Sequence, residues 1–162
     1  MTDHEIFQEL FKIAESLNSK KGAVAACLVR DGKMILSAGS CDEPNRHAED
    51  MLLEKARTEG VTIEPADILY VTLQPCGERT PGGGGEQWGD CATNIINSPV
   101  KHVVYGVPDH LYSLEVNARF DAAGISHRNF DNPEITEKAR KIFNETITDQ
   151  KYIGQKGKRA FL

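Results

Sequence analysis

Four residues stand out in the sequence because their types and order are those of a catalytic metal site. His47 and Glu49 form a His-x-Glu pair at the start of a predicted helix, Cys76 follows Pro75 after a buried segment, and Cys91 begins another predicted helix. Two thiolates and one imidazole give zinc three protein ligands and leave a fourth tetrahedral position for water, whereas structural zinc sites usually close that position. Helix N-termini also favour thiolates. The pattern therefore predicts a catalytic zinc site with His47, Cys76 and Cys91 as ligands.

Glu49 is the predicted general base and general acid of this site. Residues two apart on an ideal helix are separated by about 200°. Glu49 and His47 therefore converge only if the metal lies beyond the helix end and both side chains lean over it from the first turn. A carboxylate in that place can take a proton from water, then deliver it to a ring nitrogen and to a departing amine. The predicted reaction is hydrolytic deamination.

The elements that must position these residues follow from hydrophobic periodicity and from turn signals. Asp3 is the predicted N-cap of the first helix, and Asp31-Gly32 is a tight-turn dipeptide that pairs the first two strands as a hairpin. Residues 75–90, with Pro81 and four consecutive glycines, predict an irregular loop. Helices are predicted over 3–17, 47–59, 91–97, 114–123 and 133–146, and strands over 23–30, 33–38, 68–73, 102–107 and 125–130.

This element order predicts an α/β fold, a three-layer α/β/α sandwich around a mixed sheet of about five strands. The 162 residues predict one catalytic domain over 1–150 and a basic tail over 151–162. A hydrophobic fraction of 40% without an apolar run near the ~18 residues of a spanning helix excludes a membrane span. The net charge of −5 makes nucleic acid an unlikely partner. Because no signal peptide is visible, the protein is expected in the cytoplasm with its cysteines as thiols.

The His-x-Glu pair followed by Pro75-Cys76 and a second cysteine resembles the signature of the zinc-dependent cytidine and deoxycytidylate deaminase-like superfamily, H-x-E followed by P-C-x-x-C. The resemblance covers most of the chain, from the hairpin through about Gly124, because the element order around the motifs also matches. It implies the cytidine deaminase-like fold, a Zn²⁺ cofactor, a small-molecule pyrimidine nucleotide-like substrate and a homodimer. One departure is clear, since 14 residues instead of two separate Cys76 from Cys91.

The loop after Cys76 is most similar to that of the pyrimidine deaminases of riboflavin biosynthesis. Those proteins tolerate a longer loop that often reads P-C-S-H-x-G-R-T-P-P-C, and this chain has Arg79-Thr80-Pro81 after its own Pro-Cys. Residues 102–106 also look like the segment that follows the zinc site in that group, whereas Lys20-Lys21-Gly22 replaces the Asn-Pro pair that bacterial members carry before the first strand. The implied substrate is an aminopyrimidine with a phosphorylated ribosyl or ribityl chain. The length predicts an enzyme without the reductase domain that many bacteria fuse to it.

The candidate substrate-binding residues lie on both sides of the ligands. Arg79 and Thr80, next to the backbone N–H groups of Gly82–Gly85, are predicted to hold the phosphate. Trp88 can stack on the pyrimidine, and Asn45 precedes the His-x-Glu pair. A surface linker for the glycine run and a packing anchor for Trp88 are the alternative interpretations.

Two other functions remain open at this point. One is a deaminase of deoxycytidylate or of tRNA adenosine, although the net charge argues against tRNA. The other is a non-catalytic, zinc-stabilised binding module, which would have no use for Glu49 beside the metal. In such a module Cys41, six residues before His47, would be the candidate for a fourth ligand.

Overall fold

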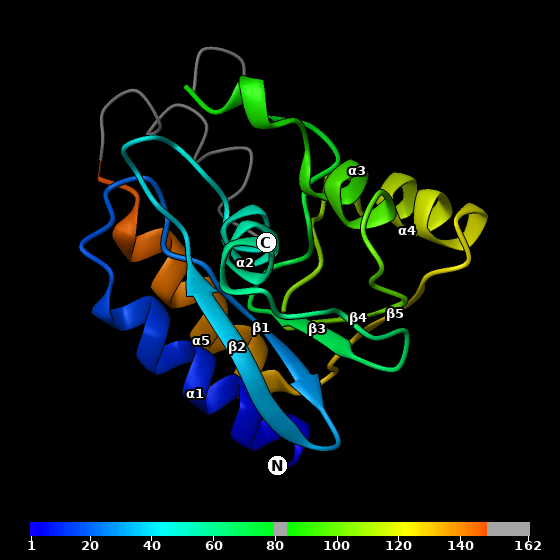
Figure 1. Ribbon diagram of the computed structural model, residues 1–162. Helices are drawn as coiled ribbons and strands as arrows, with labels where there is room; N and C mark the ends of the chain where they lie inside the picture. Colours follow the sequence, from blue (N-terminus) through cyan, green and yellow to red (C-terminus); the bar gives the residue numbers. More distant parts are fainter. Residues whose placement is uncertain (80–83, 149–162) are drawn as a thin grey trace.

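A five-stranded mixed sheet forms the centre of the protein in the computed structural model, which describes residues 1–79 and 84–148 (Figure 1). Its order is β2-β1-β3-β4-β5. The strands are β1 (Ala25–Arg30), β2 (Lys33–Gly39), β3 (Ile68–Val71), β4 (His102–Tyr105) and β5 (Ser126–Asn129). β1 pairs antiparallel with β2 and β3, while β3, β4 and β5 run parallel. The predicted mixed sheet of five strands is confirmed.

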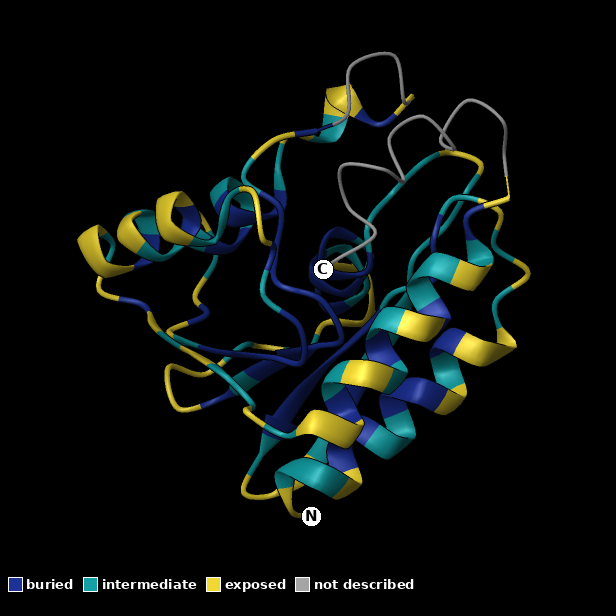
Figure 2. Ribbon diagram, turned by 180° about the vertical axis from the view of Figure 1, so that it is seen from behind, coloured by how far each residue is buried: buried dark blue, intermediate teal, exposed yellow. Residues whose placement is uncertain are grey.

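Helices cover both faces of the sheet and complete the predicted three layers. α1 (Asp3–Ser16) and α5 (Pro133–Thr146) lie side by side on one face (Figure 2). α2 (Ala48–Glu59), α3 (Cys91–Ile96) and α4 (Ser113–Ala122) cover the other. β1 is buried on both sides, with Cys27 in the core under α1 and α5 and Leu28 in the core under α2 to α4. Burial on both faces explains why the β1 sequence is almost continuously apolar.

The predicted N-cap of α1 is wrong, because Thr2 caps the helix instead of Asp3. The Thr2 hydroxyl accepts a hydrogen bond from the Glu5 backbone N–H at 3.2 Å, and the Glu5 carboxylate accepts one from the Thr2 N–H at 2.7 Å. This capping box satisfies two free N–H groups of the first turn at once. Asp3 instead accepts hydrogen bonds from the Tyr70 hydroxyl and from Arg128, both at 2.6 Å. It therefore ties α1 to the sheet.

The carboxyl ends of the parallel strands meet the N-termini of α2 and α3 at one edge of the sheet. Beyond β3 the chain stays buried, and the Gln74 N–H donates to the Val107 carbonyl at 2.8 Å. The Ala92 N–H donates to the Cys76 carbonyl at 2.9 Å, which attaches the start of α3 to this segment. Open α/β sheets bind ligands at this edge. No helix in the described part of the chain is long and apolar enough to cross a membrane.

At the end of β1 far from this edge, Arg30 and Asp67 form a bidentate ion pair. Arg30 Nε and Nη2 donate to the fully buried Asp67 carboxylate at 2.8 and 2.7 Å, and the Glu64 N–H donates at 2.8 Å. The hydrogen bonds from Arg30 lower the pKa of Asp67 below its ordinary 3.8. A carboxyl whose pKa is lower in the folded state stabilises the fold above its unfolded pKa and loses that contribution as the pH falls through the folded value.

Asp67→Asn is therefore expected to lower the free energy of unfolding by about 1.5–3 kcal/mol at pH 7, the range for hydrogen bonds to a charged group. The difference from wild type should shrink as the pH falls below about 3.8, because the unfolded wild-type carboxyl takes up a proton there, and should disappear below the lower pKa of the folded state. Urea unfolding between pH 3 and 7 measures it. The exposed Asp131 supplies the control Asp131→Asn. A difference that stays constant over this range would mean that the charge of Asp67 contributes nothing.

Candidate active site

His47 and two cysteines form a cluster at the carboxyl edge of the sheet. His47 is the N-cap of α2, and its extended backbone (φ −78°, ψ 158°) places the ring beyond the first helical turn. Its Nδ1 lies 3.4 Å from Cys76 Sγ and 3.3 Å from Cys91 Sγ. The candidate ligand atoms of the three residues all lie within 4.8 Å of one another. Over residues 1–79 and 84–148 no other group of three or more His, Cys, Asp or Glu side chains is arranged to hold a metal ion.

The two cysteines are buried and prepared to act as ligands. The Cys91 N–H donates to Cys76 Sγ at 3.3 Å. A hydrogen bond from the Cys91 thiol, with His47 beside it, holds the pKa of the Cys76 thiol well below its ordinary value. The thiolate is the form that binds metals. Two sulfurs and one imidazole nitrogen in this arrangement fit a zinc ion and leave one tetrahedral position for another ligand.

The start of α3 is fixed although a long loop precedes it. Asp90 is the N-cap of α3, and its carboxylate accepts hydrogen bonds from the Thr93 N–H and hydroxyl, both at 2.8 Å. Arg119 of α4 donates to the same carboxylate at 3.1 Å. These contacts place Cys91 independently of the length of the loop that leads to it. They explain how 14 intervening residues are compatible with the site.

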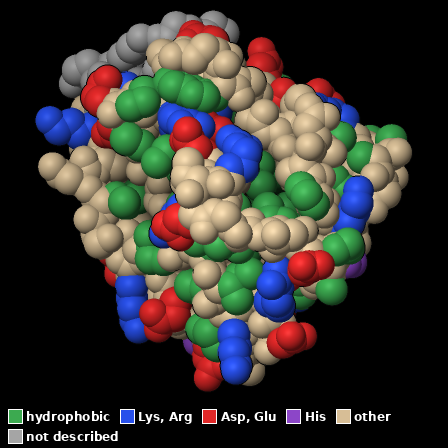
Figure 3. Space-filling model, in the orientation of Figure 1, with side chains coloured by type: hydrophobic (Ala, Val, Ile, Leu, Met, Phe, Trp, Pro, Cys, Tyr) green, Lys and Arg blue, Asp and Glu red, His purple; other side chains and the backbone are tan. Residues whose placement is uncertain are grey.

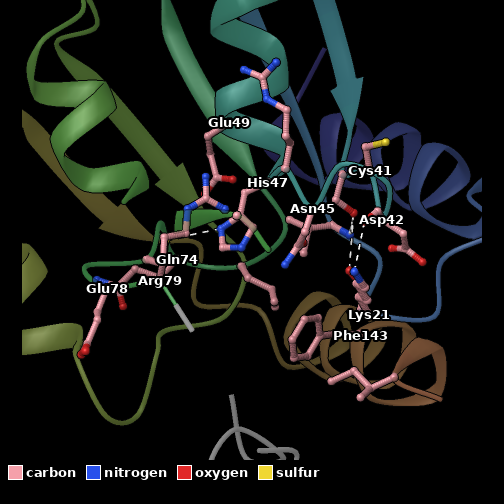
Figure 4. Close-up of a pocket in the computed structure, with 18 residues that line it drawn as sticks. Lys21, Cys41, Asp42, Asn45, His47, Glu49, Gln74, Glu78, Arg79 and Phe143 are labelled. Carbon is pink, nitrogen blue, oxygen red and sulfur yellow. Dashed lines mark hydrogen bonds between the residues drawn. The ribbon is translucent and has the colours of Figure 1, made fainter. Parts of the chain in front are cut away.

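Glu49 shares a cavity with the cluster. It belongs to the first turn of α2, is only 3% exposed, and lines the same pocket as His47 and Cys76 (Figure 4). Burial raises the pKa of its carboxyl group. Glu49 does not belong to the three-ligand cluster. The structure thus brings a buried acid into the pocket of the candidate metal ligands, outside the group of three.

Arg79 lines the same pocket with a buried guanidinium group whose side chain is 6% exposed. Its Nε donates to the Gly89 carbonyl at 2.5 Å, and Nη2 lies 3.8 Å from Asp50. Neither Nη1 nor Nη2 has a hydrogen-bond partner among the described residues. A buried donor without an acceptor costs about 1–3 kcal/mol. Among the described residues, the guanidinium group therefore has the Asp50 carboxylate as an ion-pair partner but no hydrogen bond to either Nη atom.

The remaining predicted substrate-binding residues have different positions. Asn45 lines the pocket, and a Cβ at Gly85 would overlap its carbonyl oxygen, so the loop packs closely on this segment. Trp88 does not line the pocket; its ring lies 5.0 Å from the Arg46 guanidinium carbon. This contact supports the packing interpretation of Trp88, whose role in substrate binding stays a prediction. Thr80, two glycines of the run (82 and 83) and the tail over 151–162 lie outside the described residues.

The contact between Arg46 and Trp88 belongs to a larger network at the start of α2. Arg46 Nε and Nη2 donate to the Asp50 carboxylate at 2.8 and 2.9 Å, and Arg46 also pairs with Glu54. The carbonyl of Trp88 accepts a hydrogen bond from Asn94 at 2.8 Å. Asp50 thus holds Arg46 directly and lies beside Arg79. This network connects the loop after Cys76 to α2 and to α3.

Some pocket residues were missed by the sequence analysis. Gln74 is buried, and its side chain is bonded to the Asp109 N–H and to Asn117, both at 2.9 Å. Its place just before Pro75-Cys76 was the signal that could have found it. Lys21 and Phe143 had no such signal, because they come from the segment before β1 and from α5. Cys41 lines the pocket but does not join the metal cluster of the described residues.

Comparison with known proteins agrees with this geometry. A family model described as the cytidine and deoxycytidylate deaminase zinc-binding region matches residues 1–107. Among solved structures, the diaminohydroxyphosphoribosylaminopyrimidine deaminase/5-amino-6-(5-phosphoribosylamino)uracil reductase of Thermotoga maritima is 26% identical, with a TM-score of 0.72 over 96% of this chain and 43% of that chain. The Rib2 deaminase of Aspergillus oryzae is 21% identical, with a TM-score of 0.67 over 97% of each chain.

A third similar structure is the dCMP deaminase of the cyanophage S-TIM5, at 22% identity and a TM-score of 0.55 over 80% of this chain and 100% of that chain. The Aspergillus and cyanophage structures show the shared fold. This chain spans less than half the length of the Thermotoga protein. A search of curated proteins finds no match. The match over residues 1–107, together with the fold, shows that the chain belongs to the cytidine and deoxycytidylate deaminase family and that zinc is its cofactor.

Proposed function

We propose that the protein is a hydrolytic deaminase of the phosphorylated aminopyrimidine intermediate of riboflavin biosynthesis. The observation that carries deamination is Glu49, a buried acid that lines the pocket of a three-ligand metal cluster and is not part of it. A purely structural zinc site has no use for such a residue. The substrate class is supported by the similarity to the Thermotoga protein, whose name includes diaminohydroxyphosphoribosylaminopyrimidine deaminase.

In this proposal His47, Cys76 and Cys91 hold the zinc ion, which when bound lowers the pKa of water and supplies a nucleophile at neutral pH. Glu49 takes a proton from the attacking water and passes it to a ring nitrogen of the substrate. It then takes the second proton from the same oxygen, now bonded to the ring carbon, and delivers it to the amine as the C–N bond breaks. The water oxygen becomes the carbonyl oxygen of the product, and ammonia leaves. Burial of Glu49 keeps bulk water away from these transfers.

The substrate class is tested by measuring ammonia release from the zinc-loaded protein. The panel consists of aminopyrimidine ribosyl and ribityl phosphates, cytidine nucleotides and a tRNA anticodon stem. The proposal expects turnover of an aminopyrimidine phosphate at the highest kcat/KM. Preference for dCMP would instead assign the chain to the deoxycytidylate deaminases, and release from no substrate would support the non-catalytic binding module.

The charge distribution argues against the tRNA alternative. On the face of the molecule drawn in Figure 3, basic and acidic side chains are interspersed rather than gathered into a basic surface. The net charge of the chain is −5. Proteins that bind nucleic acid gain most of their affinity from clustered Lys and Arg side chains. A small phosphorylated substrate requires only one or two such groups.

Arg79 is the proposed phosphate anchor, because its side chain lines the pocket and neither Nη atom has a hydrogen-bond partner among the described residues. Arg79→Ala is expected to raise KM for the phosphorylated substrate by tenfold or more, since it removes charge-assisted hydrogen bonds worth about 1.5–3 kcal/mol. KM for the dephosphorylated analogue should barely change. Steady-state ammonia release on the two compounds measures both values.

Arg57→Ala, at an exposed position of α2, is the control and should leave both KM values unchanged. A loss of activity on both compounds with Arg79→Ala would mean that the loop has collapsed. An unchanged KM for the phosphorylated compound would exclude Arg79 as the anchor. Lys20, Lys21 and the tail over 151–162 would then be the next candidates.

The proposal also includes a homodimer in the cytoplasm. The dimer is supported by the resemblance to the deaminase superfamily, whose members often pair. Light scattering on the purified protein tests the assembly, and a mass of one chain, 17.9 kDa, would exclude the dimer.

A further inference from the structure

The pocket has one wall that lies outside the part of the chain matched by the family model. That match ends at residue 107, whereas Phe143 of α5 and Ile147 just after it line the pocket together with His47 and Glu49. In Figure 4 the Phe143 ring projects from α5 toward the side of the pocket where Lys21 and Asn45 lie. This wall is therefore added to the zinc-binding region by a later segment of the chain.

The position of the Phe143 ring is fixed by the segment that precedes β1. Gly22 has a φ of +100°, and a Cβ at this position would overlap the ring, so only glycine suits both the backbone and the contact. The end of α5 is attached to the same segment. The Ala23 N–H donates to the Thr146 hydroxyl at 2.7 Å, and the Thr148 N–H donates to the Lys20 carbonyl at 3.0 Å. These contacts fix the end of α5 to the segment before β1, and they therefore fix the position of the Phe143 ring in the pocket.

The pocket combines an apolar side with polar groups that can form hydrogen bonds with the edge of a heterocyclic ring. Phe143 and Ile147 are apolar, and Leu73 joins them in the lining. Glu49 and Arg79 supply charged groups to the same pocket. Small-molecule sites usually combine apolar walls with a few polar groups that fix orientation, and an aromatic ring is a suitable surface for a planar heterocycle.

We propose that Phe143 is a specificity-determining residue that packs against the bound pyrimidine. This inference rests on the proposed function, because it assumes that the pocket binds a pyrimidine nucleotide. It adds to that function a recognition residue from α5. The pocket then accepts a planar ring that fits between the zinc site and the Phe143 side chain.

Equilibrium binding tests the inference separately from turnover. The parent protein is zinc-loaded Glu49→Gln, and the probes for titration calorimetry are diaminohydroxyphosphoribosylaminopyrimidine and dCMP. Adding Phe143→Leu should weaken binding of the better probe by at least fivefold, the lower end of the effect of removing a base-stacking ring. A second variant, in which Phe143→Tyr is added to the parent instead, keeps an aromatic ring and should have a Kd within about twofold of that of the parent.

Phe130→Leu is the matched control, since Phe130 is a partly buried aromatic residue that packs on the same core under α1 and α5 but does not line the pocket. It should leave Kd unchanged. An unchanged Kd with Phe143→Leu, or an equal loss with Phe130→Leu, would overturn the inference. Absence of binding to the parent would overturn the inference and the proposed function together. Binding that depends on Phe143, without ammonia release by the wild type, would overturn only the proposed function.

Discussion

Glu49→Gln is expected to keep its zinc and its fold and to lose at least ~10²-fold in turnover, the lower end of what a positioned acid or base contributes. The side-chain amide of glutamine has nearly the same shape as the carboxyl group of glutamate, so the packing around this 3% exposed residue is kept. It cannot accept the proton of the attacking water or deliver one to the departing amine. The loss should therefore appear in kcat, with little change in substrate affinity.

Ammonia release measures the rate, and atomic emission measures zinc in the same samples. Glu59→Gln, at the exposed end of the same helix, is the control and should match the wild type. Loss of zinc from Glu49→Gln would make Glu49 a ligand and the proposed mechanism wrong. A wild-type rate in this variant would show that the proton is carried by another group.

The cluster of His47, Cys76 and Cys91 could be predicted from the sequence because each residue lies at a boundary that local signals mark. His47 begins an amphipathic helix that ends at a glycine, Cys76 follows a proline after a buried strand, and Cys91 begins a helix behind an Asp cap. Local signals also marked the hairpin, where Asp31 and Gly32 both have positive φ. Helix starts, strand ends marked by proline and tight turns depend on residues close together in the chain, so they can be predicted from a single sequence.

The ends of the strands could not be read in the same way. The predicted strands over 68–73 and 102–107 end at Val71 and Tyr105 in the structure. Leu73 and Val107 nevertheless stay buried after the chain has left the sheet. Hydrophobicity reports burial rather than sheet pairing, so the pattern continues past the last paired residue.

The contribution of α5 to the pocket also could not be predicted from the local sequence. Ile135, Ala139 and Ile142 form one apolar stripe of α5, and Phe143 extends it. A stripe of this kind looks the same whether a residue fills a core or faces a cavity. The role of Phe143 follows from its place in the pocket lining, where its ring packs on Gly22, more than a hundred residues earlier in the chain.

The second large effect is expected from removal of a proposed metal ligand. His47→Ala, Cys76→Ala and Cys91→Ala should each lower zinc from about one per chain to near zero, because a site with two remaining ligands no longer fits the tetrahedral ion. Metal that binds only the folded state stabilises it by RT ln(1 + [Zn]/Kd), about 4 kcal/mol at a thousandfold excess over Kd. Each variant should lose a stabilisation of this order.

Thermal unfolding with and without a chelator separates the metal contribution from simple packing damage. Chelation should lower the wild-type Tm and leave that of the three variants unchanged, since they have no zinc to lose. Cys41→Ala is the matched control, because Cys41 is a cysteine of the same pocket outside the cluster and should respond to the chelator like the wild type. Full zinc occupancy in one of the three variants would remove that residue from the ligand set, and loss of zinc from Cys41→Ala would add a fourth ligand. A fourth ligand would close the position that the proposed reaction needs, so the zinc content of this control also bears on whether the site can be catalytic.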